Sequence, residues 1–179
     1  SICIGLDGKF AQWVGEMIPD IKQPILLVTP AGKEEEAIIR LSRVGYDGAI
    51  GYLEGGFESW VKAGKEVDTV KRITAEQFAT IHENEKPLTI DIRKKSEFQS
   101  QHITDAVNIP LNEINNHLAE FPKDKPFILH CAGGYRSMIA ASMLKQRGWD
   151  NFSDVIGGFT EIAKTNVPKS EYICPSTML

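Results

Sequence analysis

The sequence is poor in cysteine and histidine. Its 179 residues include three cysteines and four histidines. Cys3, Cys131 and Cys174 are too few and too widely spaced for a disulfide framework, and no Cys/His spacing suits a metal site. We therefore expect no metal and no cofactor. We expect the thiols to stay reduced, which favours a cytoplasmic location.

Long apolar runs and excess positive charge are also absent. No run approaches the roughly 18 residues of a membrane span, so no membrane contact is expected. A net charge of −4 disfavours nucleic acid as a partner. No secretory signal follows Ser1. Because the chain does not start with methionine, we expect a longer gene product, and a targeting signal in it stays open.

The chain does contain an internal repeat. Residues 24–57 can be laid on residues 126–159. Both segments run from an apolar strand through a loop and a helix to a second strand and a Gly-Gly turn. The clearest matches are Gly45-Tyr46-Asp47 with Gly148-Trp149-Asp150, and Gly55-Gly56-Phe57 with Gly157-Gly158-Phe159. The shared order predicts two copies of one fold.

The second copy reads as a complete series of alternating strands and helices. Thr74 and Gln77 have capping-box spacing at the start of a helix. The patterns predict helices at 74–82, 96–98, 111–121, 136–147 and 158–165, and strands at 88–92, 106–109, 127–131 and 153–156. This alternation predicts an α/β fold with a central parallel sheet and helices on both faces.

The first copy starts late, because nothing in it corresponds to residues 74–105. We interpret residues 1–63 as an N-terminally truncated domain and residues 64–72 as a polar linker. Residues 73–168 form the complete domain, and residues 169–179 form an extended or loosely held tail. The fold class is therefore two three-layer αβα units with central parallel sheets, the first one truncated.

The candidate chemistry lies in the cysteine loop, which we define as Cys131-Ala132-Gly133-Gly134-Tyr135-Arg136. It follows an apolar strand and precedes a helix, so the thiol lies at the carboxyl end of the strand. Backbone N–H groups of the loop and of the helix start would stabilise a thiolate. Gly133 and Gly134 allow unusual backbone angles, and Arg136 could bind an anionic substrate through two hydrogen bonds.

Loop length separates two chemistries. Cysteine phosphatases and arsenate reductases use Cys-x5-Arg, which encloses a tetrahedral oxyanion. The spacing here is Cys-x4-Arg, a tighter ring that suits a single sulfur atom. The sequence favours sulfur transfer over phosphatase chemistry.

Taken together, these residues resemble the rhodanese family of sulfurtransferases. The resemblance rests on Asp91-Ile92-Arg93, Phe98, His102-Ile103, Ala106, Asn108-Ile109-Pro110, the segment from Cys131 to Ser137, and Gly157-Gly158-Phe159. It implies two rhodanese-like units. It also implies a Cys131 persulfide that moves sulfane sulfur from thiosulfate or a small persulfide to a thiol or cyanide, with the cysteine loop binding the substrate. Small sulfur-containing anions and thiols are the implied partners.

The first copy departs from the family pattern at the loop. Thr29 stands at the position of Cys131, and Glu34, Glu35 and Glu36 occupy the following helix start. A threonine would not ionise there, and the glutamates would repel an anionic donor. An inert unit before an active one is similar to the C-terminal half of fusions with a metallo-β-lactamase-type persulfide dioxygenase. Such a domain, fused or associated, is an implied partner.

Plainer interpretations remain open for three residues of the loop. Cys131 could be a buried structural thiol, and Arg136 could be a solvated residue on the helix surface. Tyr135 could line the pocket or face solvent. For the whole protein, the alternatives are a non-catalytic interaction module and a sulfur relay loaded only by a partner or fused domain.

Plainer interpretations hold for four residues outside the loop as well. His130 precedes the thiol in a strand, so we expect its side chain to face away from the sulfur rather than act as a base. Asp91 and Arg93 are expected to brace loops. Cys174 could resolve the persulfide, but its place in the tail favours no role.

Overall fold

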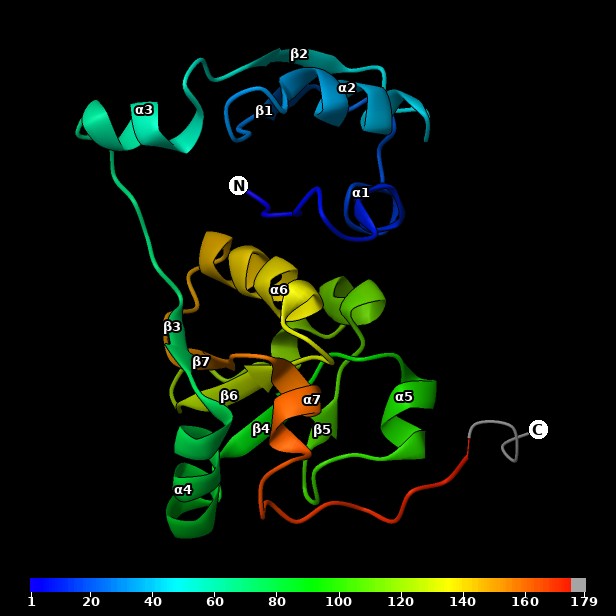
Figure 1. Ribbon diagram of the computed structural model, residues 1–179, viewed down its shortest axis with the longest axis vertical. Coiled ribbons are helices and arrows are strands. Elements are labelled where there is room, and N and C mark those ends of the chain that lie inside the picture. Colours follow the sequence, from blue (N-terminus) through cyan, green and yellow to red (C-terminus); the bar gives the residue numbers. More distant parts are fainter. Residues whose placement is uncertain (175–179) are drawn as a thin grey trace. The chain divides into compact units, whose positions relative to one another are not determined.

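The computed structural model describes residues 1–174 (Figure 1). It divides into two compact units. The larger unit contains residues from Val70 onward together with Ser1–Cys3, and the smaller unit contains Ile4–Thr69. Across the described residues no helix is long and apolar enough to span a membrane.

The larger unit is built on a five-stranded parallel sheet with the order β3-β7-β6-β4-β5. Its strands are β3 (Lys71–Ile73), β4 (Leu88–Asp91), β5 (Val107–Asn108), β6 (Phe127–His130) and β7 (Phe152–Val155). The central strands β6 and β7 are buried along their whole length, as expected for a sheet covered on both faces. The structure therefore confirms the predicted fold class of this unit.

Helices cover both faces of this sheet (Figure 1). They are α4 (Ala75–Glu85), α5 (Lys95–Ser100), α6 (Tyr135–Gln146) and α7 (Gly158–Ile162), with 3-10 segments η1 (Leu111–Asn116) and η2 (Leu118–Glu120). Phe78 of α4 and Ile162 of α7 pack with Ile128 and Val155 in one buried cluster. Helix α6 lies with η1 on the other face. The predicted capping box of Thr74 and Gln77 is confirmed.

One local prediction for this unit was wrong. The apolar spacing over 111–121 indicated one α-helix, but the chain forms η1 and η2 instead. Leu111 and Ile114 are both buried, and a three-residue spacing matches a 3-10 turn. The adjacent Asn115 and Asn116 are poor formers of helix interiors.

The described part of the tail after Pro168 is extended, the first of the two predicted alternatives, and hydrogen bonds hold it in place. Lys169 forms an antiparallel bridge with Ile103. Ser170 N–H donates to His102 O at 2.9 Å, and Ile173 N–H donates to Ser100 O at 2.8 Å. These bonds fix an extended segment beside the end of α5. The remainder of the predicted tail, residues 175–179, lies outside the described residues.

The smaller unit is a reduced α/β arrangement. Its elements are α1 (Phe10–Met17), β1 (Ile25–Leu27), α2 (Glu34–Ser42), β2 (Ala49–Tyr52) and α3 (Gly56–Lys62). Strands β1 and β2 pair in parallel, and Phe10, Val14, Leu41 and Tyr46 form the core. Within residues 4–69 the sheet has only these two strands.

The two units differ in how well matching positions are covered. Leu26 of the smaller unit stands at the repeat position of Ile128. Leu26 is 65% exposed, whereas Ile128, packed with α4 and α7, is 7% exposed. The smaller unit contains no helix at the position of α4 in its described residues, so this part of its sheet stays open.

Candidate active site at Cys131

Cys131 directly follows β6, at the carboxyl end of a central parallel strand. Gly134 adopts φ +101° and caps the start of α6. This backbone turn directs the Gly134 N–H to the Cys131 Sγ, with an N–S distance of 3.1 Å. A backbone donor at a helix start favours negative charge on the sulfur.

The remaining loop residues form the exposed part of the site. Gly133 is exposed, and Ala132 and Tyr135 are half-buried. A β-carbon on Gly133 would meet no atom within 4 Å, so the loop is open to solvent at this point. The prediction of unusual angles at both glycines was half right: of the two, only Gly134 has a positive φ.

The Gly-Gly turn before α7 fixes the loop from behind. Phe159 N–H donates to Cys131 O at 2.7 Å, and Thr160 N–H donates to Ala132 O at 3.0 Å. Gly158 has φ +53°, and a β-carbon there would lie 2.3 Å from Cys131 O. Only glycine fits this approach. The turn therefore holds the loop backbone in one conformation.

The hydroxyl group of Ser137 also lies beside the sulfur. Ser137 is fully buried, and its Oγ lies 3.6 Å from Cys131 Sγ and donates to Gly134 O at 3.1 Å. Burial raises the pKa of Asp154, and the hydrogen bond from Arg72 opposes that shift. The local sequence showed no sign of a role for Ser137 or Asp154, because only the fold brings β7 beside α6.

The guanidinium of Arg136 forms an ion pair with Glu97. Its Nη1 lies 2.6 Å from Glu97 Oε2, and its Nη2 lies 2.8 Å from Glu97 Oε1. This hydrogen-bonded pair lowers the pKa of Glu97 and raises the pKa of Arg136. Glu97 belongs to α5, 39 residues earlier, and nothing in the sequence indicated the pairing. The predicted binding of a donor by Arg136 stays a prediction.

Asp91 and Arg93 form a buried brace next to the loop. Arg93 Nε and Nη2 donate to the Asp91 carboxylate at 2.6–3.0 Å. The Arg93 guanidinium also lies 4.0 Å from the centre of the Phe159 ring, and Asn108 Nδ2 donates to the carbonyl oxygens of both residues. These contacts join β4, β5 and α7 and fit the predicted bracing role.

His130 lies behind the loop and is fully buried. Its Nδ1 contacts the carbonyl oxygen of Cys131 at 3.2 Å, and no contact with the sulfur is found in the described part of the chain. Burial lowers the pKa of His130, so the imidazole is neutral at pH 7. This position fits the expectation that His130 faces away from the sulfur.

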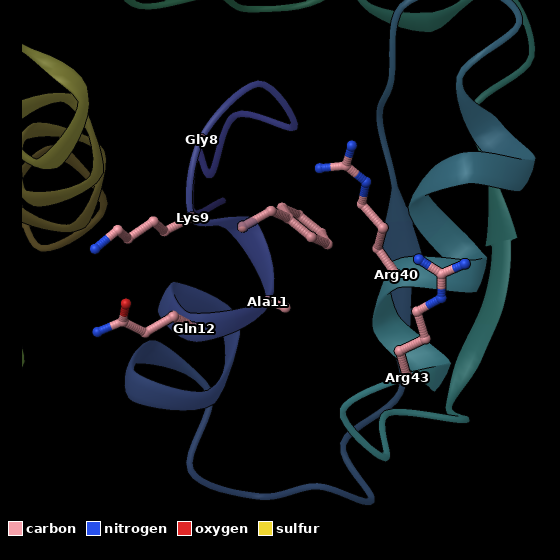
Figure 2. Close-up of a pocket in the computed structure, with 7 residues that line it drawn as sticks. Gly8, Lys9, Ala11, Gln12, Arg40 and Arg43 are labelled. Carbon is pink, nitrogen blue, oxygen red and sulfur yellow. The ribbon is translucent and has the colours of Figure 1, made fainter.

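The other features of interest lie elsewhere. Cys3 and Cys174 are exposed, and residues 1–174 contain no group of three or more His, Cys, Asp or Glu that could hold a metal. A shallow pocket lies wholly within the smaller unit, between α1 and α2. Figure 2 shows Arg40 on α2 and Arg43 directly after that helix, with Gln12 on α1 and Lys9 directly before it.

The fold and the loop define an α/β protein with a cysteine at the carboxyl end of a parallel strand. Residues 74–165, just over half of the chain, match the family model of the rhodanese-like domain. The chain therefore belongs to the rhodanese-like family. The match spans most of the larger unit and includes the whole cysteine loop.

Two known proteins illustrate this membership, and a third shares the fold alone. Thiosulfate sulfurtransferase GlpE of Pseudomonas syringae pv. syringae is 34% identical over 99 residues, which cover 55% of this chain and 92% of that protein. A rhodanese-related protein of Thermoplasma volcanium has a TM-score of 0.50 and 31% identity, and the match covers 56% of this chain and 97% of that structure. A thiosulfate sulfurtransferase of Pseudomonas aeruginosa shares the fold with a TM-score of 0.51 and 21% identity, over 89% of this chain and 35% of that structure.

Proposed function

We propose that this chain is a sulfurtransferase that carries sulfane sulfur as a persulfide on Cys131. The observation that carries the proposal is the Gly134 N–H donating to Cys131 Sγ at 3.1 Å at the start of α6. Such a donor stabilises the thiolate before reaction. The GlpE relative, whose printed name is thiosulfate sulfurtransferase, supports the same reaction class.

The reaction has two displacement steps. The Cys131 thiolate attacks the outer sulfur of the donor, a new S–S bond forms, and the donor's own S–S bond breaks. Its electron pair leaves with sulfite when thiosulfate is the donor, or with a thiolate when the donor is a persulfide. An acceptor thiolate or cyanide then attacks the outer sulfur, and the Cys131 thiolate leaves. This sequence predicts ping-pong kinetics.

The substrate-binding assignment uses the backbone of the cysteine loop. N–H groups of Ala132 to Arg136 would surround the added sulfur, with Gly133 at the open side where a β-carbon would meet nothing. Tyr135 would border the entrance. A Cys-x4-Arg loop leaves less room than the Cys-x5-Arg loop of phosphatases, which supports sulfur transfer as the chemistry.

The finer proposal for the smaller unit is an inactive rhodanese-like copy over residues 1–63, joined by a linker at 64–72 to an active domain at 73–168 that ends in a tail at 169–179. The Gly-Gly turns of the two units have similar backbone geometry, which supports this proposal. Gly56 has φ +60°, and a β-carbon there would lie 2.3 Å from Thr29 O, the same approach that Gly158 makes to Cys131. Thr29 carries no thiol, so this copy would serve in docking or scaffolding.

Partners are part of the same proposal. A metallo-β-lactamase-type persulfide dioxygenase, fused or associated, would share a small persulfide such as glutathione persulfide with Cys131. In a sulfur relay of this kind, loading from glutathione persulfide would be fast and turnover with thiosulfate would be slow. Small sulfur anions and thiols are the proposed ligands, and the cytoplasm is the proposed location.

Intact mass after incubation with thiosulfate tests the function. The wild-type chain should gain one sulfur atom that cyanide removes, and Cys131→Ser should gain none. Glutathione persulfide serves as the second donor in a parallel reaction. Absence of loading from both donors would contradict sulfur transfer and favour an interaction module. Turnover by Cys131→Ser would move the chemistry away from Cys131.

A further inference from the structure

Arg136, the cation that the sequence predicts to bind the donor, is already paired with Glu97. Both terminal nitrogens of Arg136 lie within 2.8 Å of the Glu97 carboxylate. Thiosulfate, with a charge of −2, would have to displace that carboxylate or find another positive group near the loop. Displacement would cost a charge-assisted two-point interaction, so a second cation at the loop becomes the important feature.

Arg72 supplies that cation from β3. Its Nε lies 3.1 Å from Asp154 Oδ2, and the Asp154 side chain is fully buried. The Arg72 side chain itself is 41% exposed. A single bond from Nε to a buried, immobile carboxylate fixes the direction of the guanidinium and leaves its two Nη atoms without a hydrogen-bond partner among residues 1–174.

The Nη2 atom of Arg72 lies beside the cysteine loop. A β-carbon on Gly134 would lie 3.8 Å from Arg72 Nη2. Gly134 is the residue whose N–H reaches Cys131 Sγ. The structure thus places an exposed guanidinium, aimed by Asp154, next to the turn that holds the reactive sulfur.

We propose that Arg72 binds the anionic end of the sulfur donor and so determines which donors load Cys131. This inference rests on the proposed sulfurtransferase function. During transfer the sulfonate or carboxylate oxygens of the donor accept hydrogen bonds from the Arg72 Nη atoms, which is a preferred geometry for arginine. The donor's outer sulfur then faces Cys131, and the released sulfite or thiolate leaves past Arg72.

Steady-state kinetics of the full chain test this role. Arg72→Gln keeps a donor for Asp154 but removes the charge, and Arg72→Lys keeps the charge. We expect Arg72→Gln to raise the KM for thiosulfate about tenfold or more with kcat changed less, the range that one charged hydrogen bond provides. Arg72→Lys should recover part of the loss.

Two controls separate charge recognition from a structural effect. Lys71→Gln removes a charge from the neighbouring residue, which faces the opposite side of β3, and should leave the KM unchanged. Cysteamine persulfide, a donor without a carboxylate or sulfonate, should load wild type and Arg72→Gln equally well. Equal losses with anionic and non-anionic donors, or an unchanged KM for thiosulfate, would overturn the inference.

Binding without turnover distinguishes failure of the inference from failure of the proposed function. Calorimetry with the Cys131→Ser chain and thiosulfate should show binding that weakens about tenfold or more when Arg72→Gln is added. If wild type accepts no sulfur but this difference persists, the sulfurtransferase proposal fails and the anion site stands. If sulfur loads onto Cys131 but the binding difference is absent, the proposed anion site at Arg72 is wrong and the sulfurtransferase proposal stands. Comparing thiosulfate with glutathione persulfide identifies which anion Arg72 recognises.

Discussion

Gly158 and Cys131 approach so closely that no side chain fits between them. A β-carbon on Gly158 would lie 2.3 Å from Cys131 O and 2.9 Å from Ala132 O, and Gly158 has φ +53°. The adjacent Phe159 N–H donates to the same Cys131 oxygen at 2.7 Å. The turn before α7 therefore sets the conformation of the cysteine loop, although 27 residues separate the two positions.

Gly158→Ala should destabilise the larger unit by about 2 kcal/mol or more, because it adds a backbone clash to a left-handed conformation. Chemical denaturation measures the change in the free energy of unfolding. Gly133→Ala provides the matched control for stability, since its β-carbon would meet open space, and it should change stability by less than about 1 kcal/mol. Similar losses in both variants would contradict this account.

The Glu97–Arg136 pair should contribute to stability through its two hydrogen bonds. A double-mutant cycle with Glu97→Gln and Arg136→Met should give a coupling free energy of about 1–2 kcal/mol at pH 7, between the values for exposed and buried pairs. Because the pairing lowers the pKa of Glu97, the coupling should persist above the ordinary carboxyl pKa. It should disappear as pH falls through the folded-state value. A coupling that is independent of pH would argue against an ionic pair.

His130 should make stability depend on pH. Burial lowers the pKa of His130 in the folded chain, whereas the unfolded chain keeps the ordinary value near 6.5. Below that pH the unfolded state binds a proton that the folded state does not. The free energy of unfolding should therefore fall by up to about 1.4 kcal/mol for each pH unit below about 6.5.

His130→Val isolates this contribution, because valine has no titratable group. Valine is chosen because Val28 stands at the matching position of the sequence repeat. The cavity left by the smaller side chain lowers stability at every pH equally. The variant should therefore show a shallower decline between pH 6.5 and 5 than the wild type, measured by urea unfolding at each pH. Parallel curves would show that His130 does not titrate on unfolding.

Ile128 and Leu26, which match in the sequence repeat, should respond differently when each side chain is shortened to alanine. Ile128→Ala removes a buried side chain and should cost about 2–5 kcal/mol. Leu26→Ala at the matching repeat position removes an exposed one and should change stability by less than about 0.5 kcal/mol. Thermal or chemical unfolding of both variants measures the difference. A large loss for Leu26→Ala would show that this position is covered in the folded protein.

Local patterns in the sequence were sufficient to predict much of the fold of the larger unit. Parallel strands buried on both faces are continuous apolar runs, so β6 was evident from Phe127 to His130. Thr74 and Gln77 indicated the start of α4 because a capping box involves only residues three apart. The helix predicted at 111–121 failed because one apolar spacing fits both 3-10 and α-helical turns at short length.

Only part of the candidate site could be predicted from the sequence, because local patterns relate only residues that are close together in the chain. Cys131 and Gly134 lie within one loop, so their relation follows from local chain order. Glu97 and Arg72 reach that loop through tertiary packing, from 34 and 59 residues away from Cys131. No periodicity links such distant charges, and the pairing of Arg136 with Glu97 emerged only from the folded chain.

The depth of Cys131 has a consequence for the shape of its reaction partners. The residue is 1% exposed, although Gly133 beside it is open to solvent. A thiol buried to this depth should react more readily with small, slender molecules than with broad ones. Bulky alkylating agents should thus modify Cys3 and Cys174 first. A sulfur atom stored on Cys131 would be sheltered from large oxidants and proteins while cyanide still reaches it.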